Sequence, residues 1–418
     1  MGFASTWLEE RALFPEFIKE APDKDTGIIM VIPAYNEPGI TLLLNSLASC
    51  DEPDCKVEVM VVVNAPVNAS AGNIRNNKEC IRNIENWKKE HIDCFFRLYV
   101  FNAFQPALTG WGVGLARKTG MDEAVRRFNN IGLPEGVIVN LDADCTVADN
   151  YFISLENELL KRQDRAACSL YFEHPLEDSV GNNFNFITWY ELHLRYFLQG
   201  LKYAGFPFSF HTVGSALAVK ALTYIKAGGM NRRQAGEDFY FIQKLVPAGG
   251  YFALNTTTVY PSPRVSLRVP FGTGATISKL TEEKSETLLT YNVQAFNELQ
   301  IFFKSLGIYY SSVDEELEYN YNCLPEGLRS FIDFQKWKGN IQEIKRNTSG
   351  LQSFKKRFFG WFNMFKIVKY MNHVHPGTFE KVPVNESASE LLKVIGINFT
   401  SKDATDLLKF YRSMEKNS

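Results

Sequence analysis

The feature that most constrains the fold of this chain is an apolar run that ends in two closely spaced acids. Residues 136–141 have the β-branched, apolar character of a buried strand, and Asp142 and Asp144 follow directly. In an open α/β sheet, ligands bind beyond the carboxyl ends of the strands. Two carboxylates at such an end favour a divalent cation that carries phosphate oxygens. The alternative is an Asx turn, where Asp is common because it hydrogen-bonds its own backbone.

Similar strand-like runs recur before this one and alternate with helical spacing. They cover residues 27–33, 57–63 and 95–101, and Pro33 marks a strand end because it cannot donate to a sheet ladder. Strands that alternate with helices predict an α/β fold with a doubly wound, mostly parallel, Rossmann-like sheet. The polar residues after Pro33 are then expected at the carboxyl edge of that sheet.

The pattern changes in the second half of the chain. Strand-like and helical segments mix beyond Tyr151, and almost everything after about Thr276 has helical spacing. We therefore predict a sheet domain over residues 1–275 and a helical C-terminal extension, packed on it, over residues 276–418.

Composition restricts the class of partner and the compartment. Lys and Arg total 45 against 47 Asp and Glu, so the net charge of −2 gives no electrostatic footprint for nucleic acid. The seven cysteines form no CxxC pair, which indicates reduced thiols. No signal-peptide pattern and no run of eighteen apolar residues is present. We expect a cytoplasmic protein, or one peripheral to the inner face of a membrane.

Two further motifs suit chemistry at the sheet edge. Glu237 and Asp238 precede an amphipathic helix, where they provide either a general base or ordinary first-turn charge that the helix dipole stabilises. The glycine-rich turn at 110–114 fails as a dinucleotide site because Leu115 occupies the third glycine position. A turn that passes close to a nucleotide explains the glycines, with Arg117 and Lys118 facing phosphate; the alternative is a plain helix start with surface cations.

Several basic residues have both a binding and a structural interpretation. Arg264 and Arg268 suit a loop that folds over a diphosphate, or are solvated loop arginines. His211, just before a strand, is a candidate for substrate contact. Residues 355–371 are basic and aromatic together, so they form either an interfacial helix that touches a membrane or a helix with an aromatic core side. His373 and His375 could ligate a metal but are more often surface residues.

Read together, these pieces resemble the family 2 glycosyltransferases of the GT-A fold. The residues that carry the resemblance are, in chain order, 31–37 (VIPAYNE), 110–117 (GWGVGLAR), Asp142-Ala143-Asp144, 214–219 (GSALAV) with Gly228-Gly229, and Glu237-Asp238. They span roughly residues 27–275.

The resemblance implies a metal-dependent transfer of a sugar from a nucleotide-sugar donor to an acceptor hydroxyl, by single displacement with inversion; retention stays open. Asp144, with Asp142, would hold Mg²⁺ or Mn²⁺, and Asp238 would be the catalytic base beside Glu237. The acceptor would be a glycan, a lipid-linked sugar or a small molecule. The residues that would contact the donor nucleotide are Pro33, Ala34, Tyr35, Glu37, Asn64, Arg117 and Asp142.

The sequence departs from the family pattern in two places. Asn64 stands where the family usually has an acid after the second strand, which puts the usual uridine preference in doubt. The Gln-x-x-Arg-Trp motif of processive synthases is absent, so we expect a non-processive enzyme. Two rival functions are a sugar-1-phosphate nucleotidyltransferase and a non-catalytic carbohydrate-binding protein on the same fold.

Overall fold

The computed structural model describes residues 2–103, 112–176, 182–233, 236–264, 287–375 and 377–418. Contacts divide the chain into two compact units, each made of separate segments. The first unit contains Met1–Val180, Thr212–Ser278 and Lys416–Ser418, and the second contains Gly181–His211 and Lys279–Glu415. The predicted boundary at residue 275 falls in 265–286, outside the described residues. The division also assigns residues 181–211, which we placed in the sheet domain, to the helical unit.

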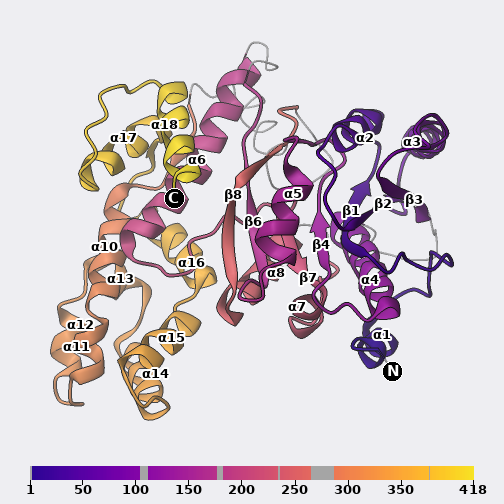
Figure 1. The fold of residues 1–418 in the computed structure, drawn as a ribbon. Helices are drawn as coiled ribbons and strands as arrows, with labels where there is room; N and C mark the ends of the chain where they lie inside the picture. Colours follow the sequence, from indigo (N-terminus) through magenta and orange to yellow (C-terminus); the bar gives the residue numbers. More distant parts are fainter. Residues whose placement is uncertain (1, 104–111, 177–181, 234–235, 265–286, 376) are drawn as a thin grey trace. The chain divides into compact units, whose positions relative to one another are not determined.

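The first unit is built on an eight-stranded sheet with the order β3-β2-β1-β4-β7-β6-β8-β5 (Figure 1). The pairs β1–β2, β2–β3, β1–β4 and β6–β8 are parallel, whereas β7 runs antiparallel to both β4 and β6. The strands are β1 (Thr26–Ala34), β2 (Lys56–Asn64), β3 (Phe96–Ala103), β4 (Val137–Asn140), β5 (Thr146–Val147), β6 (Ala167–Phe172), β7 (Leu217–Lys220) and β8 (Tyr251–Tyr260). The structure confirms the predicted α/β fold class with a mostly parallel sheet and a helical C-terminal region.

Helices cover this sheet because its central strands have no solvated side. All nine residues of β1 are buried, so side chains on both of its faces are covered. On one face, Gly120 of α4 lets that helix approach Val31 and Val62 so closely that a Cβ at this glycine would overlap Val31. The helices of the unit are α1 (Ser5–Arg11), α2 (Ile40–Ala48), α3 (Ala71–Glu90), α4 (Val113–Ile131), α5 (Tyr151–Leu155), α7 (Ala221–Lys226) and α8 (Glu237–Leu245), with a π-helical turn at Glu156–Leu160 and a short 3₁₀ turn at Val246–Ala248.

Helix α4 buries charge as well as apolar surface. The Arg127 guanidinium pairs with Glu58 of β2, and Glu123 accepts hydrogen bonds from the amides of Phe17 and Ile18 in the N-terminal segment. Lys118 pairs with Asp122 at 2.8 Å on the same helix. The polar residues of this helix are therefore paired inside the unit rather than solvated.

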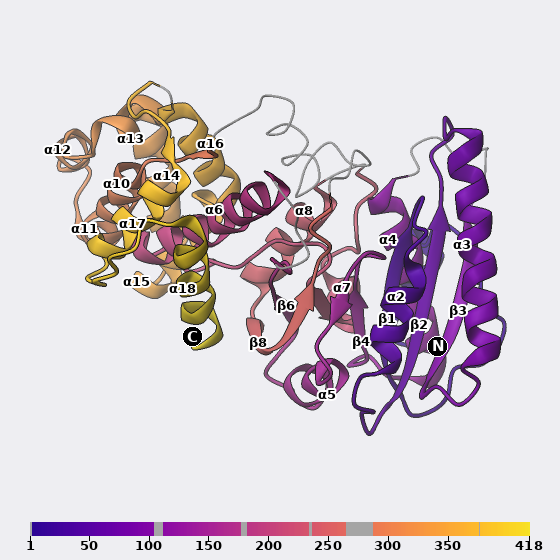
Figure 2. The ribbon, with the colours of Figure 1, turned by 90° about the horizontal axis from the view of Figure 1, so that it is seen from above.

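The second unit is helical around the long helix α6. This helix packs against α10 and α17, as both views show (Figure 2). Its elements are α6 (Asn182–Ala204), β9 (Leu289–Thr290), α10 (Val293–Lys304), α11 (Leu306–Ser311), α12 (Leu317–Asn322), α13 (Glu326–Phe331), α14 (Phe334–Arg346), α15 (Leu351–Trp361), α16 (Met364–Val374), β10 (Val382–Pro383), α17 (Val384–Val394) and α18 (Ala404–Lys416).

Two sequence expectations about the environment can be compared with this fold. All seven cysteines are free thiols, and Cys50, Cys80, Cys145 and Cys168 are buried. In the part of the chain that the structure describes, no helix has both the length and the apolarity that a membrane span requires.

Candidate active site

Strand register brings the predicted acids to one edge of the sheet. β1 and β4 run parallel with Val31 opposite Asn140, and the Leu141 amide donates to the Val31 carbonyl at 3.1 Å. The segments that follow the two strands, which contain Glu37, Asp142 and Asp144, therefore leave the sheet on the same side. Neighbouring parallel strands explain this proximity without any long-range assumption.

Arg117 of α4 connects the acid after β4 with the acids of α8. Its guanidinium donates to Asp142 Oδ1 at 2.5 Å and to Glu237 Oε1, and it lies 4.0 Å from Asp238 Oδ2. The side chain is only 5% exposed. Burial alone would lower the pKa of this group, but Asp142, Glu237 and Asp238 outweigh that effect and raise the Arg117 pKa. The arginine is thus a permanently charged clamp between the segment after β4 and the start of α8.

Two glycines make room for this clamp. A Cβ at Gly214 would overlap the Arg117 guanidinium, and a Cβ at Gly114 would overlap the Arg233 carbonyl and approach Glu237 Cγ to 3.0 Å. Both glycines belong to the segments that suggested the family resemblance. The lack of space for a side chain, rather than backbone flexibility, is the physical reason for glycine at these two positions.

The Asp238 carboxyl is partly shielded from water but still reachable from solvent. It is the second residue of α8, and its Oδ1 accepts a hydrogen bond from the Phe239 amide at 2.7 Å. Burial raises its pKa from 3.8 to about 6, with Arg117 opposing the rise and Glu237 and Asp142 adding to it. The side chain is still 23% exposed. A carboxylate with a pKa close to the working pH and a path to solvent has the properties of a general base.

Arg264 binds the other two acids at this edge of the sheet, Glu37 and Asp144. Its Nη1 donates to Glu37 Oε1 at 2.9 Å, and its Nη2 donates to Glu37 Oε2 and, at 3.0 Å, to Asp144 Oδ2. Burial alone would lower the Arg264 pKa, but the bond to Glu37 and the charges of Asp144 and Glu37 outweigh it, so the pKa is raised. We predicted phosphate contact for this arginine; here its guanidinium meets two carboxylates.

A row of asparagines on α3 holds the ends of β1 and β2, and the sequence reading missed it. Asn77 Oδ1 accepts from the Asn36 amide at 2.7 Å, while its Nδ2 donates to the Asn64 carbonyl at 2.7 Å. Asn73 and Asn76 donate to the Tyr35 hydroxyl and to Asn36 Oδ1, each at 2.7 Å. The spacing of 73, 76 and 77 places all three on one helix face, which is the signal that could have identified them.

Asn36 itself has an unusual backbone. Its φ of +52° lies in the left-handed region, where asparagine is the best tolerated residue after glycine. This conformation turns the chain sharply after β1, and the next residue, Glu37, points its carboxylate at Arg264. The α3 asparagines therefore fix the turn that places Glu37.

The remaining predicted residues have distinct locations. Pro33 and Ala34 are the last two residues of β1, and Asn64 is the buried last residue of β2. His211 belongs to the second unit, where its Nε2 lies 3.0 Å from Glu415 Oε2. Arg268 lies outside the described residues. His375 uses both ring nitrogens on backbone groups, at Met371 and Asn292.

The donor set at the edge fits a divalent cation that arrives with phosphate oxygens. Within the cluster of Glu37, Arg117, Asp142, Asp144, Glu237, Asp238 and Arg264, carboxylates outnumber guanidiniums five to two. Asp142 and Asp144 are 36% and 25% exposed, so two oxygen ligands are reachable. Among the described residues, no three His, Cys, Asp or Glu side chains are arranged so that together they could hold a metal ion. Mg²⁺ typically binds one or two carboxylates plus substrate phosphates, which matches this half-site.

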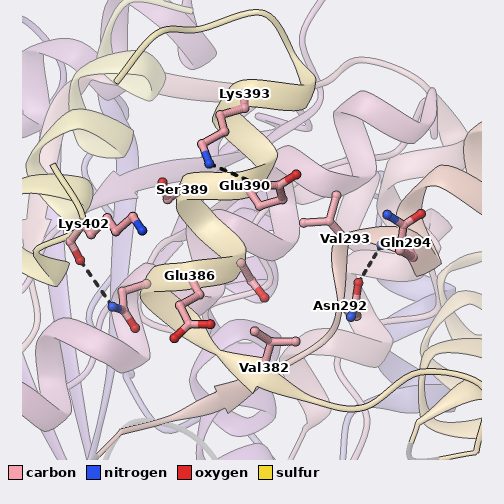
Figure 3. Close-up of a pocket in the computed structure, with 11 residues that line it drawn as sticks. Asn292, Val293, Gln294, Val382, Glu386, Ser389, Glu390, Lys393 and Lys402 are labelled. Atoms are coloured by element: carbon pink, nitrogen blue, oxygen red, sulfur yellow. Dashed lines mark hydrogen bonds and ion pairs between the residues drawn. The ribbon is translucent and has the colours of Figure 1, made fainter. Parts of the chain in front are cut away.

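The helical unit contains a separate cavity of about 400 Å³ (Figure 3). Its wall includes an ion pair between Lys393 and Glu390 at 3.4 Å and a hydrogen bond from Asn385 to the Lys402 carbonyl. Polar groups of this wall bind one another, and the chemistry of the carboxylate cluster is not present there. We therefore assign the candidate active site to the sheet edge of the first unit.

Comparison with known proteins gives a limited result. No protein-family model and no curated protein matches the sequence. Among solved structures, TarS residues 1–349 from S. aureus in complex with UDP-GlcNAc match at 12% identity over 80% of this chain and 91% of that chain, with a TM-score of 0.39. The mannosyltransferase PcManGT from Pyrobaculum calidifontis in complex with GDP-Man and Mn²⁺ matches at 14% identity over 99% and 92%, with a TM-score of 0.34.

A third similar structure is glucosyl-3-phosphoglycerate synthase from Mycobacterium tuberculosis in complex with Mn²⁺, UDP and phosphoglyceric acid. It matches at 12% identity over 57% of this chain and 75% of that chain, with a TM-score of 0.34. Similarities at these identities and TM-scores assign no activity to the chain.

Proposed function

We propose that this chain is a family 2 glycosyltransferase that moves a sugar from a nucleoside-diphosphate donor to an acceptor hydroxyl. The observation that carries the proposal is the position of the Arg117 guanidinium, which binds Asp142 after β4 and lies 4.0 Å from Asp238, a carboxylate with a pKa of about 6. One clamp thus couples a candidate base, Asp238, to a candidate diphosphate–metal site. The two halves of a sugar transfer, donor binding and acceptor activation, need this adjacency.

In the proposed reaction the acceptor oxygen bonds to the anomeric carbon while the bond from that carbon to the diphosphate oxygen breaks. Asp238 takes the proton of the acceptor hydroxyl, and the nucleoside diphosphate leaves. Arg117 orients Asp142 and Glu237 on either side of the reacting centre. A divalent cation held by Asp144 and Asp142 would neutralise the charge that develops on the leaving diphosphate.

The donor nucleotide would lie along the ends of β1 and β2. Tyr35 and the Asn64 segment are both held there by α3, which leaves a fixed edge for a base and ribose to bind against. A direct displacement by the acceptor inverts the anomeric carbon, and a single site of this kind suits the addition of one or a few sugars. We propose an inverting, non-processive enzyme on these grounds.

The test uses nucleoside diphosphates and nucleotide sugars, each with and without Mn²⁺, on the full-length protein. A ligand at a hundred times its Kd should stabilise the fold by about 2.7 kcal/mol. We expect a metal-dependent shift for wild type, no such shift for Asp144→Ala, and a normal shift without turnover for Asp238→Asn. Asp164→Ala, which removes a surface carboxylate paired with Arg162, should match wild type in both readouts.

Three results separate the rival functions. Turnover in Asp238→Asn equal to wild type would remove the base assignment. Tighter binding of nucleoside triphosphates than of diphosphates would favour the nucleotidyltransferase. A shift with glycans alone would favour a carbohydrate-binding protein.

We further propose that the helical unit contacts anionic lipid surfaces through residues 355–371. The stretch 344–379 contains seven Lys or Arg and no Asp or Glu, in a chain of net charge −2. Phe354, Phe358 and Phe362 are fully buried, so the aromatic side is core and the contact would be electrostatic. We call Lys355, Lys356, Arg357, Lys366 and Lys369 the basic surface. No ion pair to a carboxylate is recorded for these five within the described ranges.

A further inference from the structure

Arg264 binds two carboxylates in different ways: it forms a bidentate bond to Glu37 and a single hydrogen bond to Asp144. Both guanidinium nitrogens of its fork bind the two oxygens of Glu37, whose side chain is only 1% exposed. The same Nη2 also reaches Asp144 Oδ2 at 3.0 Å, and Asp144 is 25% exposed. A bidentate bond to a buried carboxylate is the stronger and more directional of the two contacts.

Asp144 is also the carboxylate that the proposed function assigns to a divalent cation. Mg²⁺ binds carboxylate oxygens at about 2.0–2.1 Å, a position that would set its double charge beside the guanidinium of Arg264. Two cationic groups that share one carboxylate repel each other at this distance. The arginine and the metal therefore cannot both satisfy Asp144 at full strength.

We infer that Arg264 is an internal counter-ion that competes with the divalent cation for Asp144 until a nucleoside diphosphate is bound. The inference rests on the proposed function and deepens it. In the nucleotide-free protein Arg264 neutralises Asp144, so metal binds weakly by itself. A diphosphate adds negative oxygens at the same place, which offers the guanidinium and the metal separate partners and removes the competition.

The consequence is a positive coupling between metal and nucleotide to which the Arg264 side chain contributes. Couplings of this kind are typically about 5- to 150-fold, and they are reciprocal between the two ligands. Removing the positive charge of Arg264 should raise the affinity of the nucleotide-free protein for metal. It should at the same time reduce the gain in metal affinity that the nucleotide provides.

The experiment measures Mn²⁺ binding by electron paramagnetic resonance of free Mn²⁺, with and without UDP or GDP, on full-length protein. We expect Arg264→Gln to bind Mn²⁺ at least about fivefold more tightly than wild type without nucleotide, with a smaller nucleotide effect. Arg162→Gln is the matched control, because it removes the same charge from an exposed arginine. It should leave both quantities unchanged.

A second variant covers the case in which Gln at 264 removes the bidentate bond to Glu37 and the protein unfolds, which circular dichroism would reveal. Arg264→Lys keeps the positive charge and should keep the weak Mn²⁺ binding of wild type. Equal or weaker Mn²⁺ binding in folded Arg264→Gln, with binding lost in Asp144→Ala, would overturn the competition and leave the transferase proposal standing. If no variant binds Mn²⁺ even with nucleotide, both proposals fall.

Discussion

At the scale of single residues, the candidate site contains two arginines that differ in their exposure to solvent. Arg117 is 5% exposed and bridges three carboxylates, so its position is fixed by the fold. Arg264 is 35% exposed and binds the buried Glu37 together with the partly exposed Asp144. A fixed cation suits the orientation of catalytic groups, whereas a partly solvated one suits exchange with a ligand.

The raised pKa of Asp238 predicts that its ionised form destabilises the fold. A carboxyl whose pKa is higher in the folded protein than in the unfolded chain loses stability as the pH rises through that interval, here from 3.8 to about 6. We expect the free energy of unfolding of Asp238→Asn at pH 8 to exceed that of wild type by about 1 to 3 kcal/mol. The variant should therefore unfold at a higher urea concentration. The difference should shrink towards zero near pH 4.

Urea denaturation of both proteins at the two pH values measures this effect. Asp164→Asn, a change at an exposed carboxyl, should show no comparable gain at pH 8. A less stable Asp238→Asn at pH 8 would mean that the ionised carboxylate is a net stabilising partner of Arg117. The raised pKa would then no longer support the general-base role of Asp238.

At the scale of elements, α3 and α4 decide how the sheet edge is shaped. Both helices turn polar residues inward: α3 through Asn73, Asn76 and Asn77, and α4 through Arg117 and Arg127. Buried polar groups of this kind specify a position because each unpaired partner would cost free energy.

Asn77→Ala is expected to destabilise the protein by about 2 to 4 kcal/mol, because it leaves the Asn36 amide and the Asn64 carbonyl without their partner. Chemical denaturation measures the loss. Asn86→Ala removes an exposed asparagine from the same helix and should change stability by less than about 0.5 kcal/mol. Nucleotide affinity should fall together with stability only in the first variant; a neutral Asn77→Ala would show that α3 does not hold the turn.

The sequence predicts the central strands well because each is a mostly apolar run, and strand ends alone predict which acids share an edge. It could not give the partners of Arg264, since those depend on the path of the chain after β8. It assigned no partners to Glu123 and Arg127, which lie on one side of α4. The N-terminal segment covers that side through the Phe17 and Ile18 amides and the Glu20 carbonyl, which is a long-range contact without a local signal.

At the scale of the whole molecule, charge is distributed unevenly. The basic surface lies on α15 and α16, where the Lys366 ammonium stands 4.1 Å from the Trp361 ring centre. Burial and, as a smaller effect, repulsion by the neighbouring Lys369 lower the pKa of Lys366. A surface of mutually repelling cations gains free energy when an anionic layer meets it.

We expect the protein to bind vesicles that contain phosphatidylserine and not vesicles of phosphatidylcholine alone. The triple variant Lys355→Glu, Lys356→Glu, Arg357→Glu should lose at least about 3 kcal/mol of binding, because each cation near a bilayer contributes about 1 kcal/mol. Vesicle co-sedimentation at low and high salt measures this. A control with Lys78, Lys88 and Lys89 of α3 changed to Glu has the same net charge and should still bind; equal loss in both variants would exclude a specific surface.

The order of elements along the chain has a consequence for protein synthesis. Helix α6 is made between β6 and β7, yet it packs on α10 and α17, which begin at Val293 and Val384. At 5–20 residues per second, the interval between the end of α6 and the start of α17 is roughly 10 to 40 s. During that time the side of α6 that packs on α17 lacks this partner, although α10 is made earlier. The nascent chain is thus exposed to misassembly at this side of α6 until α17 has been synthesised.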